Sequence, residues 1–289
     1  MKIRIGTRKS RLALVQTNMA AAALKRIDPR CETEIVPIST TGDKRLDKPL
    51  TEIGGKGVFV SEIERALQSG RIDIAVHSAK DLPITIAEGL EISAVLERGN
   101  YRDVLVTRKG TGVRNSGDFI IGTGSMRRRC NLKQLYPAIG FADIRGNVDT
   151  RLNKLRDGQY DGIILAAAGL ERAGLDSLAD FDYKPFDYTE FLPAPCQGII
   201  AVESRINDSL VPVLKEINDK RTYIAFETER YIINRLGGDC TMPIGAYSYA
   251  ENKQITIAAS KDGSSDHAQI AKGDITDRFD IAEWVISRL

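Results

Sequence analysis

The pattern that most constrains the fold is an alternation of short apolar strands with amphipathic helices over the first two thirds of the chain. Residues 2–6 have the pattern of a strand, and Ser10 is placed to cap a helix that runs to about Ile27. Further strands are predicted at residues 34–38, 72–77, 119–123, 141–144 and 162–166, and helices at 58–68, 125–136, 148–156 and 167–173. Such alternation is typical of α/β domains, so we expect mixed, mostly parallel sheets.

The chain is expected to leave the first sheet and later return to it. Residues 91–96 and 103–107 have strand patterns on either side of a Gly-Asn pair, which marks a crossover into a second domain. Residues 180–195 are expected to form a loop, and 199–203 a strand that returns to the first sheet. Helices at 209–216, 221–236 and 280–288, with a hairpin at 244–249 and 254–259, suggest a small α+β third domain.

Composition narrows the class of protein. The 289 residues, 42% of them hydrophobic, are enough for two or three domains. Lys and Arg number 41 against 39 Asp and Glu, and this near balance does not fit a general nucleic-acid binder. The N-terminal segment does not resemble a signal peptide, and no stretch approaches the roughly 20 apolar residues of a membrane span. We therefore expect a cytoplasmic protein without a nucleic-acid or membrane partner.

The four cysteines are far apart in the sequence. Cys31, Cys130, Cys196 and Cys240 include no CxxC pair, so a zinc site is not expected. In a reducing compartment they are expected to be free thiols, and at least one is available for chemistry.

Two segments place basic residues between a predicted strand and a predicted helix. The first holds Arg8 and Ser10, and the second holds Ser125, Arg127 and Arg128. Backbone N–H groups at a helix start favour an anion, which a nearby Arg binds through two hydrogen bonds. The alternative is a Ser N-cap beside solvated basic residues, and for the first segment alone it is the more common case. Recurrence in two successive α/β units favours anion binding.

Three more arginines follow predicted strands of the second domain. Arg145 ends a strand, Arg151 lies one turn into the next helix, and Arg172 lies beyond the strand at 162–166. Open α/β sheets bind ligands at such strand ends, and gathered guanidinium groups indicate several carboxylates or phosphates. A nucleotide would also satisfy these charges, but there is no Walker A motif and no GxGxxG after a strand.

A carboxylate and an ammonium group follow the predicted strand at 72–77. Asp81, set among cations such as Lys80, is expected to stay ionised and to stabilise a developing positive charge. His77 is a rival acid or base, although a histidine at a strand end is more often structural. The other histidine is His267, so a His-based catalytic triad is poorly supported.

Cys240 follows a glycine-rich turn, Gly237-Gly238-Asp239. A thiol on such a turn is accessible and can act as a nucleophile. The alternative is an inert buried cysteine, which is the more frequent case for a lone cysteine.

Six segments in this order resemble the porphobilinogen deaminase (hydroxymethylbilane synthase) family. They are GGKGVFV (54–60), HSAKDLP (77–83), GTGSMRR (122–128), VDTRLNKL (148–155) after IRGN, LPAPCQG (192–198) and the GGDC turn that ends at Cys240. The resemblance implies an α/β protein of three domains, at 1–97 with 197–216, at 98–196 and at 217–289. The first two would resemble type 2 periplasmic binding proteins with a cleft between them, and the third, small α+β domain would carry the cofactor cysteine.

The resemblance also implies a transferase of porphyrin (haem-type tetrapyrrole) biosynthesis. Four porphobilinogen molecules would add to a dipyrromethane cofactor that is joined to Cys240 by a thioether, and hydrolysis would release hydroxymethylbilane. Asp81 is the implied catalytic acid, because its carboxylate can stabilise the pyrrole cation that forms when ammonia leaves. A monomer without a metal ion is expected.

Each added ring brings two carboxylates, which explains the many cationic side chains. The implied cofactor-binding residues are Lys80, Asp81, Ser125, Arg127, Arg128, Arg145 and Gly146. The implied substrate- and chain-binding residues are Arg8, Ser10, Lys56, Arg145, Arg151, Arg172 and Gln197. Lys56 falls in the loop at 42–58, which matches the family's active-site lid, and a lid would exclude water from the reactive cation.

Four positions depart from the family pattern. Gly124, Arg129, Asp239 and Cys196 stand where Ser, Gln, Gly and Gly are common. Cys196 is a possible second reactive thiol, with packing as the favoured reading.

Two other functions compete with this reading. A non-catalytic binding protein for a small dicarboxylate explains the arginines but leaves Asp81 and Cys240 without a purpose. An RNA-binding role for residues 127–129 fits the near-neutral charge poorly.

Overall fold

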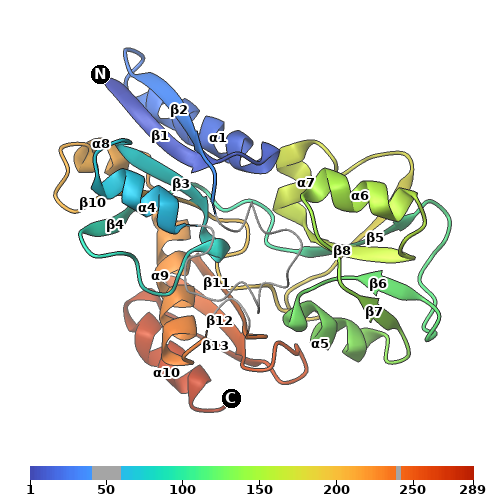
Figure 1. Ribbon diagram of the computed structural model, residues 1–289. Coiled ribbons are helices and arrows are strands. Elements are labelled where there is room, and N and C mark those ends of the chain that lie inside the picture. Colours follow the sequence, from blue (N-terminus) through green and yellow to red (C-terminus); the bar gives the residue numbers. More distant parts are fainter. Residues whose placement is uncertain (41–59, 239–241) are drawn as a thin grey trace. The chain divides into compact units, whose positions relative to one another are not determined.

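The computed structural model describes residues 1–40, 60–238 and 242–289, and these residues form two compact units (Figure 1). The first unit comprises Met1–Gly99 and Ile199–Glu227, and the second comprises Asn100–Gly198 and Thr228–Leu289. The division into three domains at the boundaries given above stays a prediction.

The first unit is built on a five-stranded sheet in the order β2-β1-β3-β10-β4. Its strands are β1 (Lys2–Arg8), β2 (Glu32–Ile38), β3 (Ile74–Ser78), β4 (Leu90–Val95) and β10 (Ile200–Arg205). β1 runs parallel to β2 and β3, whereas β10 runs antiparallel to β3 and β4. The predicted return of the chain to the first sheet is confirmed by β10.

Helices cover both faces of this sheet. α1 (Arg11–Ile27) and α8 (Val211–Glu216) pack on one face, where Leu24 and Leu214 meet Ile5 and Val202. On the other face, α4 (Ser61–Gln68) buries Leu67 among a second apolar cluster. Because both faces are covered, the loops at the carboxyl ends of β1 and β3 are left to carry polar groups.

The second unit repeats this strand order in its own five-stranded sheet, β7-β6-β8-β5-β9. Its strands are β5 (Asp103–Arg108), β6 (Ile120–Gly122), β7 (Gly140–Ala142), β8 (Gly162–Ala166) and β9 (Phe181–Pro185). β6 runs parallel to β7 and β8, and β5 runs antiparallel to β8 and β9. α6 (Val148–Arg156) and α7 (Ala167–Ala173) pack on one face and α5 (Met126–Leu135) on the other.

A small antiparallel sheet completes the second unit. It contains β11 (Gly245–Glu251), β12 (Gln254–Ser260) and β13 (Gln269–Asp274), and α10 (Arg278–Ile286) follows it. α9 (Lys220–Arg235) carries Glu229, whose wholly buried carboxylate accepts hydrogen bonds from the backbone of two other segments. Its Oε1 accepts the amide of Ser248 at 2.7 Å, and its Oε2 accepts the amide of Cys196 at 2.5 Å.

The α/β class, the two mixed sheets and the small third sheet confirm the predicted fold class. In the described part of the chain, each large sheet has as many antiparallel strand pairings as parallel ones. The antiparallel pairings all involve one strand, β10 in the first sheet and β5 in the second, which the chain reaches by a crossover. The prediction of a loop throughout 180–195 is wrong, since β9 lies inside it. β9 pairs with β5 as an edge strand, and Pro185 ends it, as is typical of edge positions. Among the described residues, no helix combines the length and apolar character needed to cross a bilayer.

Candidate active site

The first unit gathers three of the predicted site residues around one cavity. Arg8 ends β1, Ser10 caps α1 by accepting the amide of Ala13 at 3.3 Å, and Asp81 lies in the 3-10 turn η1 (Ala79–Asp81) after β3. A cavity of about 70 Å³ is lined by Arg8, Ser10, Leu12, Ala13, Gln16, Val60, Val76, His77, Ser78 and Asp81. Parallel β1 and β3 bring these residues together because their carboxyl ends meet at one edge of the sheet.

Hydrogen bonds fix the turn that carries Asp81. The Ala79 amide donates to the Ile199 carbonyl at 3.0 Å, and the Ser78 hydroxyl donates to Gln16 Oε1 at 2.9 Å. The turn is therefore attached both to the start of β10 and to α1. Asp81 itself is partly exposed, and its neighbour Lys80 is not among the residues that line the cavity.

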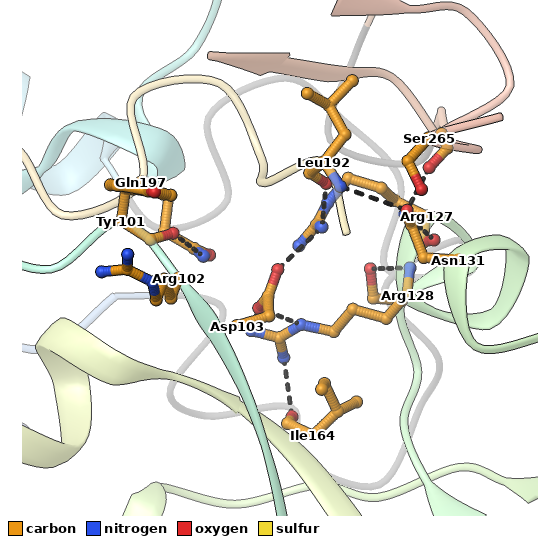
Figure 2. Close-up of polar contacts among 12 residues, drawn as sticks. Tyr101, Arg102, Asp103, Arg127, Arg128, Asn131, Ile164, Leu192, Gln197 and Ser265 are labelled. Carbon is orange, nitrogen blue, oxygen red and sulfur yellow. Dashed lines mark hydrogen bonds and ion pairs between the residues drawn. The ribbon is translucent and has the colours of Figure 1, made fainter. Parts of the chain in front are cut away.

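The second unit brings Arg127 and Arg128 together on a residue that sequence reasoning missed, Asp103 (Figure 2). Arg127 Nη1 lies 2.8 Å from Asp103 Oδ2, and Arg128 Nη2 lies 2.7 Å from Asp103 Oδ1. Each guanidinium also donates to a carbonyl, of Leu192 at 2.6 Å and of Ile164 at 2.9 Å. The one signal in the sequence is that this acidic residue opens a strand and is followed directly by three apolar residues, Val104 to Val106.

Burial dominates the electrostatics of this cluster. Asp103 is 0% exposed, and Arg127 and Arg128 are 4% and 8% exposed. Burial lowers the pKa of Arg127 from its usual value, and the Asp103 carboxylate works against that shift. Two guanidinium groups share one carboxylate, so the cluster carries a net positive charge in a buried setting, where an anionic group would be stabilised.

Ser125 and Arg145 follow the carboxyl ends of β6 and β7. Ser125 caps α5 by accepting the Arg128 amide at 3.4 Å. The partly buried Arg145 guanidinium forms no hydrogen bond or ion pair within the described ranges 1–40, 60–238 and 242–289. Gly146 has a φ of 110°, and a Cβ there would lie 2.7 Å from Thr150, so glycine is needed at this turn.

The other side chains predicted for the site in the second unit, those of Arg151, Arg172 and Gln197, donate hydrogen bonds to backbone carbonyls. Arg151 Nε donates to Gly146 at 2.8 Å, and Arg172 Nη2 donates to Gly198 at 2.6 Å. Burial lowers the pKa of Arg172. Gln197 is wholly buried and donates to the Tyr101 carbonyl at 2.7 Å (Figure 2). In this structure these three side chains support loops at the strand ends.

The structure describes three of the four cysteines. Cys31 and Cys196 are buried and Cys130 is partly buried, and none of the three forms a disulfide. Burial raises the pKa of Cys31 and of Cys130, which disfavours their thiolates at neutral pH. Cys196 has a left-handed φ of 61°, where glycine is favoured, and its burial suits the packing role. Cys240 and Lys56 lie outside the described residues.

The donors of the second unit suit a cofactor that carries several carboxylates. The group at the start of α5, with Arg127 and Arg128 sharing Asp103, retains net positive charge, and Arg145 is uncommitted among the described residues. Cationic and N–H donors are the groups that recognise carboxylates. The residues present therefore fit a dipyrromethane.

Known proteins match the chain over most of its length. A family model described as porphobilinogen deaminase, dipyromethane cofactor binding domain, matches residues 3–212. A probable porphobilinogen deaminase of Methanocaldococcus jannaschii is 45% identical over 280 residues, 96% of this chain and 94% of that protein. A porphobilinogen deaminase of Roseiflexus sp. is 45% identical over 255 residues, 88% of this chain and 83% of that protein.

The chain also aligns with solved structures at low sequence identity. The VFT2 domain of BvgS from Bordetella pertussis aligns with 81% of this chain and 92% of its own, at 17% identity and a TM-score of 0.43. The family model covers the segments that hold Asp81, Ser125 and Arg145. The chain belongs to the porphobilinogen deaminase family.

Proposed function

We propose that the chain is a hydroxymethylbilane synthase, a transferase of porphyrin biosynthesis. It joins four porphobilinogen molecules, with loss of ammonia at each addition, and releases the linear tetrapyrrole hydroxymethylbilane. The observation that carries this proposal is the cavity of the first unit, where Arg8, Ser10 and Asp81 meet in a chain whose residues 3–212 match the family.

Asp81 has the chemistry that the deamination step needs. Porphobilinogen is a pyrrole with an acetate, a propionate and an aminomethyl group, and loss of ammonia leaves positive charge on the pyrrole. The Asp81 carboxylate accepts a hydrogen bond from the pyrrole N–H and stabilises that charge. Arg8 and the capped start of α1 at Ser10 line the same cavity and bind a substrate carboxylate there.

The second unit holds the cofactor and the growing chain. When bound, the dipyrromethane supplies the free ring carbon to which the first substrate molecule joins. Its carboxylates are held by cations and N–H donors, and the Lys80 ammonium is proposed for the same role. The residues proposed for this role are Ser125, Arg127, Arg128, Arg145 and Gly146, and those proposed for the later rings are Arg151, Arg172 and Gln197.

Two parts of the proposal concern residues outside the described ranges. Cys240 attaches the cofactor through a thioether, and Lys56 belongs to a lid that excludes water from the cation. A cytoplasmic monomer of three domains is part of the same proposal.

Incubation of the purified protein with porphobilinogen tests the proposed function. The expected result is four ammonia molecules released for each hydroxymethylbilane detected by mass. A non-catalytic binding protein would instead retain porphobilinogen without releasing ammonia, and that outcome would refute the proposal. Heat-denatured protein is the control for spontaneous condensation.

Replacing Arg145 with alanine should stall elongation at an intermediate length. Its guanidinium is uncommitted among the described residues and follows the carboxyl end of β7, so it is available to the carboxylates of the growing chain. Mass spectrometry of the enzyme after substrate addition should show one bound intermediate in excess. Arg156→Ala is the control, because that exposed residue of α6 pairs with Asp180 at the surface. A normal spread of intermediates in Arg145→Ala would exclude a role in chain handling.

A further inference from the structure

A histidine–carboxylate pair lies buried in the first unit, next to the cavity that holds Asp81. His77 Nε2 is 2.9 Å from Glu203 Oε2, and the two side chains are 4% and 0% exposed. The pair joins β3 to β10, and His77 also lines the cavity with Asp81, Arg8 and Ser10. Sequence reasoning favoured a structural histidine at this position and gave Glu203 no role.

Glu203 is unusual because one of its two carboxylate oxygens accepts no hydrogen bond from the described residues. Oε1 is buried and finds no hydrogen-bond partner within residues 1–40, 60–238 and 242–289. A buried carboxylate normally accepts several hydrogen bonds, and leaving one unmade is destabilising. The backbone pairing of β3 with β10 is complete without the side chains, so holding the strands together does not explain this arrangement.

Among the charged groups around His77, Glu203 is the one placed to act as its counterion. Glu64 of α4 is the other buried carboxyl on this face, and burial, followed by the negative charge of Glu203, raises its pKa. Glu64 is therefore a weaker acid than a free glutamate, and Glu203 is the carboxylate in direct contact with the imidazole, at 2.9 Å. On the cavity side stand Arg8, from the end of β1, and Asp81, from η1.

We propose that His77, held by Glu203, relays the proton that Asp81 receives in each condensation step. This inference rests on the proposed function. In each addition the bond between the methylene carbon and the nitrogen of the protonated aminomethyl group breaks, and the nitrogen leaves with the bonding electrons as ammonia. The methylene carbon bonds to the acceptor ring carbon, which gives its proton to the Asp81 carboxylate.

The relay returns Asp81 to its ionised form before the next addition. An imidazole that donates from Nε2 to Glu203 has a lone pair on Nδ1, which can take the proton. The cavity of about 70 Å³ has room for water that carries the proton from Asp81 to His77. The imidazolium is stabilised by Glu203 until it gives the proton to water, from which ammonia takes it as ammonium. No proton or electron is gained or lost in the cycle.

His77→Gln is the decisive variant. The Gln amide nitrogen can still donate to Glu203, so the hydrogen bond is kept, but an amide cannot carry a proton. We expect kcat to fall roughly 10- to 100-fold, with KM within about twofold of wild type and an altered pH profile of kcat. The thermal midpoint and the fraction of protein that carries the pyrrole adduct, read by intact mass, should stay near wild type.

Two further variants separate relay from structure. Glu203→Gln should also lower kcat, because the imidazolium loses its counterion. Ser204→Ala is the matched control, since the neighbouring residue of β10 forms an equally buried hydrogen bond, with Ser93 at 2.6 Å. It should lower the thermal midpoint without changing the pH profile.

Imidazole rescue adds a second test. His77→Gly opens a space beside the cavity, and added imidazole should restore part of its turnover.

A wild-type kcat and pH profile in His77→Gln would overturn the relay. So would a loss of turnover that only follows a loss of folded or adduct-bearing protein. Absence of ammonia release by the wild-type enzyme would be a different result, because it would remove the proposed function itself.

Discussion

Replacing Asp81 with asparagine should lower the turnover of porphobilinogen by roughly a thousandfold while the fold stays intact. The amide is nearly the same size as the carboxylate, and hydrogen bonds from Ala79 and Ser78 hold the turn. An uncharged amide cannot stabilise the pyrrole cation or accept the proton of the condensation. The loss should appear in kcat, because the missing interaction is made in the transition state.

The measurement is the rate of ammonia release at saturating porphobilinogen, with the thermal midpoint as the test of folding. Glu88→Gln is the control, since it removes one negative charge from an exposed position of the same unit. The control should retain wild-type turnover. An Asp81→Asn enzyme within tenfold of wild type would exclude Asp81 as the group that stabilises the cation.

The second large effect is on stability. Asp103→Ala should lower the free energy of unfolding by about 3–5 kcal/mol, because it leaves two buried guanidinium groups without their shared carboxylate. Their carbonyl partners at Leu192 and Ile164 remain but carry no net charge to offset the desolvation. The variant is also expected to purify with less cofactor, since Arg127 and Arg128 lose their fixed positions.

Urea unfolding followed by circular dichroism gives the free energy, and intact mass gives the cofactor content. Asp180→Ala is the control, because Asp180 forms a solvent-exposed ion pair with Arg156 in the same unit. Pairs of that kind contribute little, so no measurable loss is expected. If Asp103→Ala were as stable as this control, the buried cluster would not be what positions the two arginines.

Local signals in the sequence were sufficient for much of the fold. Ser10 and Ser125 cap helices as expected, and α6, β8 and α7 begin and end where the pattern predicts. Two edge strands, β9 and β13, were not predicted, because each pairs along one side only and needs no strong apolar alternation. Their polar and Pro-containing sequences resemble loops, and only the neighbouring strand reveals them.

The part of the candidate site that lies at strand ends and helix caps was predictable from the sequence. Arg8, Ser10 and Asp81 meet because parallel strands end at one edge, which the strand pattern implies. Side-chain partners were not predictable, because they depend on residues far apart in the chain. Asp103 lies 24 residues before Arg127, and Glu203 lies 126 residues after His77.

The three consecutive arginines of α5 show the same limit. Neighbours on a helix point about 100° apart, which predicts that some turn inward and some outward. Arg127 and Arg128 are the inward ones, and Arg129 pairs with the exposed Asp143 at 2.6 Å. Which of the three turns inward depends on where Asp103 lies, and that is a property of the folded sheet.

Peptide mass spectrometry of catalytically active protein tests the central claim most directly: that this chain extends a pyrrole oligomer anchored to itself. The peptide that contains Cys240 should carry the mass of two linked pyrrole rings, while those with Cys31, Cys130 and Cys196 stay unmodified. Active protein in which Cys240 is a free thiol would contradict the account.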